Sequence, residues 1–212
     1  MRRYYAGELE ADSAVHFIGT ITGAISAAVL LALAFVANTA VFLSVLVYGI
    51  GLVAMLFFSA AYHLQRSSRR RDLLRRLDHA AIFVMIAGTY TPFTVCTLTS
   101  TSAVWLTGPM WLAALVGVIL KLSCPHWPDW ASTTVYLVMG WAVVVFMQPL
   151  LAALDRFTVI LLVSGGVLYS VGACIHGWRQ LPFHDAIWHG LVLGAAGLHY
   201  AAILFGVVLS PV

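Results

Sequence analysis

The sequence predicts an all-α integral membrane protein, a bundle of seven transmembrane helices in one domain over residues 1–212. Three observations predict this fold. Hydrophobic residues make up 62% of the chain and charged residues only 9%, whereas a soluble domain carries about 25% charged residues. The apolar residues gather in seven runs, each near the roughly 20 residues that cross a bilayer. The cationic residues fall almost entirely on one side of the resulting topology.

The apolar runs follow a short polar segment, residues 1–13, which lacks the apolar stretch and cleavage site of a secretory signal, so we expect the N-terminus to be retained. The predicted helices cover residues 14–36, 39–63, 79–98, 103–121, 131–148, 157–177 and 184–208. Asn38 with Thr39 separates the first two. An arginine-rich segment precedes the third, and Thr99 to Ser102 precede the fourth. Pro125 with Pro128 precedes the fifth, and Pro182 the seventh.

The distribution of Lys and Arg predicts the orientation. With a cytoplasmic N-terminus, ten of the eleven lie on the inner side: Arg2, Arg3, six arginines between residues 66 and 76, Lys121 and Arg179. Only Arg156 lies outside. Cytoplasmic loops carry such an excess of positive charge. We therefore expect a cytoplasmic N-terminus, an external C-terminus and a location in the cell membrane, the bacterial inner membrane.

The arginine-rich segment between the second and third helices, HLQRSSRRRDLLRRLDH, suits anionic lipid headgroups as well as nucleic acid. We interpret it as an inner loop whose arginines meet membrane phosphates, and we expect membrane lipids and no nucleic acid as partners. The three cysteines are far apart and odd in number, so no disulfide framework is predicted.

Ionisable residues at the inner ends of the apolar runs are the candidate site. His63 ends the second run, Asp78 precedes the third, and Asp185 and His189 lie in the first turns of the seventh. Such residues at membrane depth cost roughly 2.5–3.5 kcal/mol, so they tend to be paired and functional. Ser59 and His63 have i, i+4 spacing, as do Asp185 and His189, which places each pair on one helix face.

Histidines and carboxylates that converge from separate helices are typical of a zinc site, in which a bound water has a pKa of about 7. A nearby carboxylate can move the proton of that water, and a hydroxyl can hold the substrate oxygen. A single histidine in a membrane helix is more often a hydrogen-bonding core residue. The spacing alone leaves metal binding and structural packing equally open.

At these motifs the chain resembles the haemolysin III family, the bacterial branch of the progestin and adiponectin receptor superfamily, which belongs with the ceramidase-like CREST membrane hydrolases. The matching stretches are SAVHFIG (Ser13 to Gly19), FFSAAYH (Phe57 to His63), LDHAAIFVMIAGTYTPF (Leu77 to Phe93), VYLVMGW (Val135 to Trp141) and AIWHGLVLGAAGLHY (Ala186 to Tyr200). They occur in the order of the family and extend over most of the chain.

The resemblance implies a seven-helix bundle with zinc near its cytoplasmic end. In the family, a histidine ending the second span and an HxxxH pair opening the seventh hold the metal; His63 and His189 match the first and last of these. Ser59 and Asp78 match the family's serine and its aspartate near the metal-bound water. The first histidine of the pair is Asp185 here.

The substitution at position 185 leaves three possibilities for the metal. Asp185 ligates directly, His184 replaces it through an adjusted helix start, or the site is weakened or metal-free. We favour direct ligation, because zinc accepts a carboxylate and the i, i+4 geometry is kept. The predicted ligands are thus His63, Asp185 and His189, with His184 as the alternative third ligand.

The leading functional hypothesis is a zinc-dependent membrane hydrolase acting on an amide or ester bond of a lipid, or in membrane homeostasis, with Asp78 and Ser59 as catalytic residues. The alternative is a non-enzymatic, lipid-responsive regulator or receptor-like protein, or a pore-forming haemolysin. Against a pore, no predicted span has a polar stripe along its whole length. A third possibility is a structural zinc site closed by Asp78.

Overall fold

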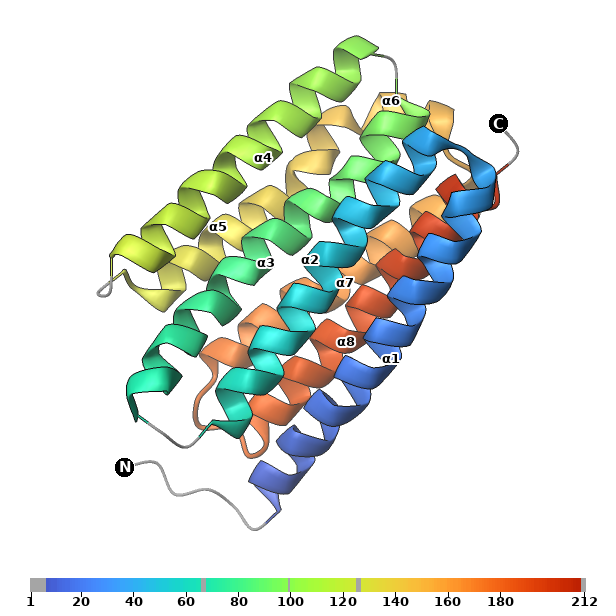
Figure 1. Cartoon of the computed structure of the whole chain (residues 1–212). Coiled ribbons are helices and arrows are strands. Elements are labelled where there is room, and N and C mark those ends of the chain that lie inside the picture. Colours follow the sequence, from blue (N-terminus) through green and yellow to red (C-terminus); the bar gives the residue numbers. More distant parts are fainter. Residues whose placement is uncertain (1–6, 66–67, 99, 125–126, 211–212) are drawn as a thin grey trace.

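The computed structural model describes residues 7–65, 68–98, 100–124 and 127–210, and within them the protein is a bundle of helices without strands (Figure 1). Six helices are long and apolar enough to cross a membrane. They are α1 (Glu8–Ala37), α2 (Thr39–Leu64), α3 (Ser68–Thr97), α4 (Ser100–Ser123), α7 (Arg156–Gly177) and α8 (His184–Ile203), which continues in the π-helical turn η2 (Leu204–Val208).

Two helices begin earlier than the apolar pattern predicts. Helix α1 starts at Glu8 and α3 at Ser68, whereas the predicted runs start at residues 14 and 79. The extra turns of α3 are rich in Arg and Leu, which are good helix formers, and contain no Gly or Pro. The helices therefore extend past the apolar segment at this end. Apolarity predicts the membrane-crossing part of a helix, not its full length.

The predicted fifth helix, 131–148, is interrupted. The chain forms α5 (Asp129–Trp141), then a 3₁₀ segment η1 (Ala142–Phe146), then the short helix α6 (Met147–Ala153). Pro149 lies in the first turn of α6, where its missing N–H needs no helical partner. In a continuous α-helix the ring of Pro149 would clash with the carbonyl four residues earlier. The proline therefore favours a new helix start at Met147.

Tyr90 of α3 satisfies backbone groups at the break between α5 and η1. Its hydroxyl lies 2.8 Å from the carbonyl oxygen of Met139 and 2.9 Å from that of Gly140, to which it donates. The same oxygen accepts the backbone N–H of Val143 at 3.1 Å. The Tyr90 hydroxyl thus replaces backbone hydrogen bonds that a continuous α-helix would make at this point.

Glycines allow the first helices to approach one another closely. A Cβ at Gly51 of α2 would lie 3.1 Å from the backbone Cα of Met85 in α3. A Cβ at Gly23 of α1 would lie 2.1 Å from a methyl carbon of Leu56 in α2. Close backbone approach through small residues is typical of packing between membrane helices. These contacts hold α1 and α3 against opposite faces of α2.

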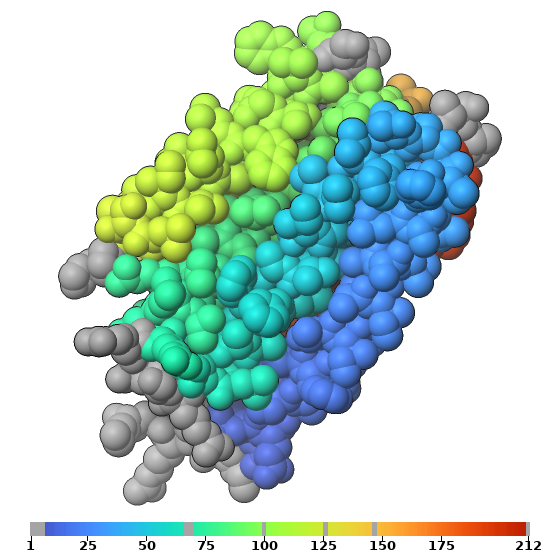
Figure 2. All heavy atoms as spheres, viewed as in Figure 1, coloured from blue at the N-terminus to red at the C-terminus, as the bar shows by residue number. Residues whose placement is uncertain are grey.

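The outer surface of the bundle is apolar. Figure 2 shows the face formed by α1, α2, α3 and α4. Phe17, Val104 and Leu112 are between 63% and 68% exposed, which would be costly in water and is expected against lipid. Together with the six long apolar helices, this surface identifies a multi-pass membrane protein. One end of the bundle carries the described arginines of α3 and Arg179, and we call it the arginine-rich end.

Candidate metal centre

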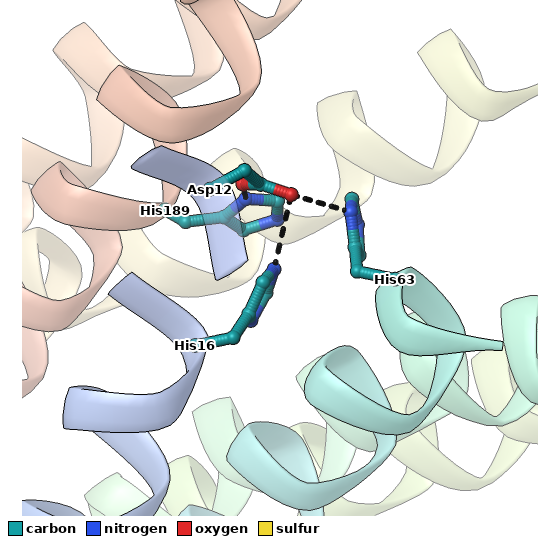
Figure 3. A group of neighbouring side chains, drawn as sticks. All are labelled: Asp12, His16, His63 and His189. Carbon is teal, nitrogen blue, oxygen red and sulfur yellow. Dashed lines mark hydrogen bonds and ion pairs between the residues drawn. The ribbon is translucent and has the colours of Figure 1, made fainter. Parts of the chain in front are cut away.

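Four side chains converge near the arginine-rich end, from the consecutive helices α1 and α2 and from α8, which is distant in sequence (Figure 3). Asp12 and His16 come from the first turns of α1, His63 from the last turn of α2 and His189 from the second turn of α8. One potential ligand atom of each residue lies within 4.8 Å of those of the others. This separation is small enough for the four to share one metal ion.

The carboxylate of Asp12 is the centre of the group. Its Oδ1 lies 2.7 Å from Nδ1 of His189, and its Oδ2 lies 2.9 Å from Nδ1 of His63. The Nε2 of His16 is 3.6 Å from Oδ2, beyond hydrogen-bonding distance. The three imidazole rings surround the carboxylate, with ring centroids 4.3 to 4.6 Å apart.

The fold explains why these residues meet. Asp12 and His16 have i, i+4 spacing, which puts both on one face of α1. One turn further along, Gly19 lets that face approach its neighbours, because a Cβ there would lie 3.3 Å from Leu193 of α8 and 3.8 Å from Leu56 of α2. The glycine brings α1 close to the helices that carry His189 and His63.

The donor set fits a metal ion. Asp12 is 7% exposed and His16 6%, so both are largely withdrawn from water. The Nε2 of His16 is buried and has no hydrogen-bond partner within the described part of the chain, although it points into the group. A buried nitrogen lone pair without a partner is costly unless something binds it. Imidazole nitrogens and a carboxylate oxygen are ligands that zinc accepts.

The two predicted catalytic residues line the cavity that borders the group. Asp78 lies in α3 and Ser59 one turn before His63 in α2, and the Ser59 hydroxyl is within hydrogen-bonding reach of the Asp78 carboxylate. The structure thus brings four sequence-predicted residues, Ser59, His63, Asp78 and His189, to one cavity. Their catalytic and ligand roles stay predictions.

The predicted third ligand lies outside the group of four. The carboxylate Oδ1 of Asp185 is 3.0 Å from Nδ1 of its neighbour His184, at the start of α8. Both residues line the same cavity, yet neither belongs to the convergent group. Ligation by Asp185 or His184 therefore stays a prediction, while the geometry favours Asp12 and His16 as partners of His63 and His189.

The sequence reasoning did not select Asp12 and His16. Asp12 lies in the polar segment before the predicted first helix, so the apolar pattern assigns it no helical relation to His16. The available signal was the i, i+4 spacing of a carboxylate and a histidine, the same rule that drew attention to Asp185 and His189. This spacing places Asp12 and His16 on one face only if the first helix begins before residue 14, where the apolar run starts.

A cavity of about 660 Å³ extends from this group into the bundle. Its walls include Met55 of α2 and Phe93 of α3, then Leu150 of α6 and Val159 of α7 near the opposite end. The volume lies within the roughly 300–1,000 Å³ of small-molecule sites. The polar residues gather at the arginine-rich end, and the deeper wall is mainly apolar. An elongated, largely apolar ligand with one polar end suits this shape.

Comparison with known proteins places the chain in one family. The model of the family described as Haemolysin-III related matches residues 11–200. The Hemolysin-3 homolog of Bacillus subtilis (strain 168) is 38% identical over 165 residues, 78% of this chain and 78% of that protein. Hemolysin-3 of Bacillus cereus is 39% identical over 162 residues, which are 76% of this chain and 74% of that protein.

A more distant relative is the monocyte to macrophage differentiation factor of Homo sapiens, 29% identical over 175 residues, which are 78% of this chain and 71% of that protein. No solved structure matches. The resemblance predicted from the motifs is confirmed: the chain belongs to the haemolysin III family.

Proposed function

We propose that this protein is a metal-dependent membrane hydrolase that cleaves an amide or ester bond of a lipid. The observation that carries the proposal is the convergence of four potential metal ligands at the polar end of a long apolar cavity. We further propose seven crossings, with residues 129–153 as the fifth, and a cytoplasmic arginine-rich end, as the excess of positive charge there predicts.

The nitrogens of His16, His63 and His189 would hold the metal, with Asp12 beside them. When bound, zinc supplies a Lewis acid and a water whose pKa is about 7. The carboxylate of Asp78 then accepts a proton from the attacking water and returns it to the leaving nitrogen or oxygen. The Ser59 hydroxyl holds the Asp78 carboxylate in position. The apolar wall of the cavity orients the acyl chain, so that the scissile carbonyl stays at the polar end.

The first test is metal content. Elemental analysis of the purified protein is expected to find one zinc per chain in the wild type, and a clear loss in His63→Ala and His16→Ala. Asp185→Ala decides the remaining ligand question: retained zinc favours the group of four, and lost zinc favours Asp185. A wild-type protein without stoichiometric metal would remove the proposal.

The second test is turnover. Fluorophore-labelled N-acyl and O-acyl lipids, presented in mixed micelles, are expected to be hydrolysed by the wild type and not by Asp78→Asn. The variant should keep its zinc and its thermal midpoint, since the substitution changes one oxygen to nitrogen without loss of volume. Equal hydrolysis by wild type and Asp78→Asn contradicts the mechanism.

A structural zinc site is the second candidate, because four protein donors close a tetrahedral shell. Neighbouring ligand atoms in such a shell lie roughly 3.3 Å apart, whereas Asp12 is only 2.7 and 2.9 Å from the two Nδ1 atoms. These are hydrogen-bond distances, so Asp12 fits better as a partner of the histidines than as a ligand. Three histidines then leave one position for water. Zinc retained in Asp12→Asn supports this open site, and zinc lost with full thermal destabilisation supports the structural one.

The names of the Bacillus relatives suggest a pore as a further candidate. His199 of α8 lines the cavity far from the metal centre, and its Nε2 lies 3.2 Å from the carbonyl oxygen of Leu162. Conductance of liposomes containing the purified protein, abolished in His199→Ala, would favour a pore over a hydrolase.

A further inference from the structure

A second, smaller pocket lies at the arginine-rich end, where α3 starts, α4 ends and α5 starts. Its volume is about 210 Å³, and we call it the corner pocket. Three permanently charged cations line it, Arg75, Arg76 and Lys121, together with the carboxylates of Asp72 and Asp129. The proposed hydrolase chemistry uses none of these residues. The three cations and two carboxylates together leave the pocket with one excess positive charge.

The carboxylate of Asp129 is shared among several cations. Arg75 donates to its Oδ2, and Nζ of Lys121 donates to Oδ1 at 3.2 Å. The Nε2 of His79 lies 3.6 Å from the same Oδ1. Lys121 is only 5% exposed, so its charge is held where water screens it poorly. One carboxylate cannot neutralise two fixed cations, and the site retains an attraction for an anion.

Arg76 supplies the free donors. Its Nη1 donates to the carbonyl oxygen of Leu122, near the end of α4, at 3.3 Å. No further partner of this guanidinium occurs in the part of the chain that the structure describes, so most of its N–H groups remain available. A planar guanidinium matches the oxygens of a phosphate group in a two-point contact. The ammonium of Lys121, which also lines the pocket, adds a compact positive charge.

We propose that the corner pocket binds a phosphate group. A phosphodiester carries one negative charge, which equals the excess of fixed positive charge in the pocket. The headgroup of a phospholipid is the source that the surroundings favour. Trp127 lines the pocket, and the neighbouring Trp130 is 73% exposed. Tryptophans gather at the membrane–water interface, which is the level of lipid phosphates.

The corner pocket adjoins the large cavity, because Asp72, Arg75, His79 and Asp129 line both spaces. A lipid held by its phosphate here would lie beside the cavity that reaches the metal centre without occupying the centre itself. The inference is independent of the proposed hydrolase activity, because it rests on residues that contact no member of the metal group.

The experiment measures the thermal midpoint of the purified full-length protein in a maltoside detergent, which contains no phosphate. Three probes are titrated separately: dioctanoyl phosphatidylglycerol, dioctanoylglycerol and inorganic phosphate. The second has the same acyl chains as the first and lacks the phosphate. The variants are Arg76→Gln and, as the matched control, Arg70→Gln, which makes the same change on an exposed residue of α3 outside the pocket.

Phosphatidylglycerol is expected to raise the midpoint of the wild type and of Arg70→Gln, whereas Arg76→Gln should need about tenfold more lipid for the same rise, since a bond to a charged partner is lost. Dioctanoylglycerol should have no comparable effect. A rise with inorganic phosphate that also depends on Arg76 keeps the phosphate site and identifies a free anion as its ligand. Equal effects of the two lipids, or equal responses of the two variants, would overturn the proposal.

Discussion

Tyr90 and Tyr48 offer a paired test of the helix break, because the same change should have opposite effects at the two positions. The hydroxyl of Tyr90 contacts three backbone groups, on Met139, Gly140 and Val143. Tyr48 of α2 is fully buried, and its hydroxyl has no hydrogen-bond partner among the residues that the structure describes. Replacement of either tyrosine by phenylalanine removes one oxygen and little volume.

The expected magnitudes follow from these contacts. Tyr90→Phe removes the hydroxyl partner of the Gly140 carbonyl and of the Val143 N–H, whereas the Met139 carbonyl keeps the backbone N–H of Ala142. A polar backbone group left unsatisfied away from water costs about 1–3 kcal/mol. We expect the free energy of unfolding to fall by about 2 kcal/mol. Tyr48→Phe removes a buried hydroxyl that gains no bond, so its effect should lie between zero and about 1 kcal/mol of stabilisation.

The assay is thermal unfolding of both variants in the same detergent. For a chain of this size, 1 kcal/mol corresponds to roughly 2–4 °C in the midpoint. Tyr90→Phe should therefore unfold several degrees below the wild type, and Tyr48→Phe at or slightly above it. Equal losses in the two variants would refute the reasoning, since they would show that the loss of either hydroxyl matters irrespective of its partners.

Three further predictions concern packing, pH and metal. Gly51→Ala should lower the free energy of unfolding by about 1–3 kcal/mol, because its Cβ meets backbone of α3, whereas Gly197→Ala, with nothing within 4 Å, should be neutral or stabilising in the same denaturation assay. Asp155, which caps α7, has a pKa below its usual value because Thr158 donates a side-chain hydrogen bond to it. Its contribution to stability is therefore present above its ordinary pKa of about 3.9 and is lost as the pH falls through the lower value in the folded protein. Asp155→Asn should keep the cap and weaken the loss of stability as the pH falls below about 4, and a pH profile identical to that of the wild type would contradict this. A chelator should lower the thermal midpoint of the wild type and leave that of His63→Ala unchanged; equal shifts would argue against metal at this site.

The sequence predicts the membrane class, and four of the six long helices that the structure describes have bounds close to the predicted ones. These predictions succeed because apolar composition reports directly on contact with lipid. It reports poorly on helix ends in water, and α1 and α3 accordingly begin before their predicted starts. The break at residues 142–146 depends on Pro149 and on a hydrogen bond from Tyr90, far away in sequence.

In the candidate site, too, local sequence patterns predict some residues, and others depend on contacts between distant helices. His63 and His189 could be selected because motifs and spacing mark them within one helix each. Asp12 meets them only through the packing of α1 against α2 and α8, which depends on the small volume of Gly19. The sequence pattern within α1 does not predict which helices will pack against it. Local spacing on α8 therefore predicts Asp185 as the third ligand, whereas the structure brings Asp12 and His16 to His63 and His189.

The separation between Asp12 and His189, 177 residues along the chain, has a consequence for biogenesis. The first two helices leave the ribosome with Asp12, His16 and His63, but α8 is made last. The complete set of donors cannot exist until the final helix has inserted and docked against α1. Metal captured at this centre would therefore mark a finished bundle, and a truncated or wrongly inserted chain would be left without it.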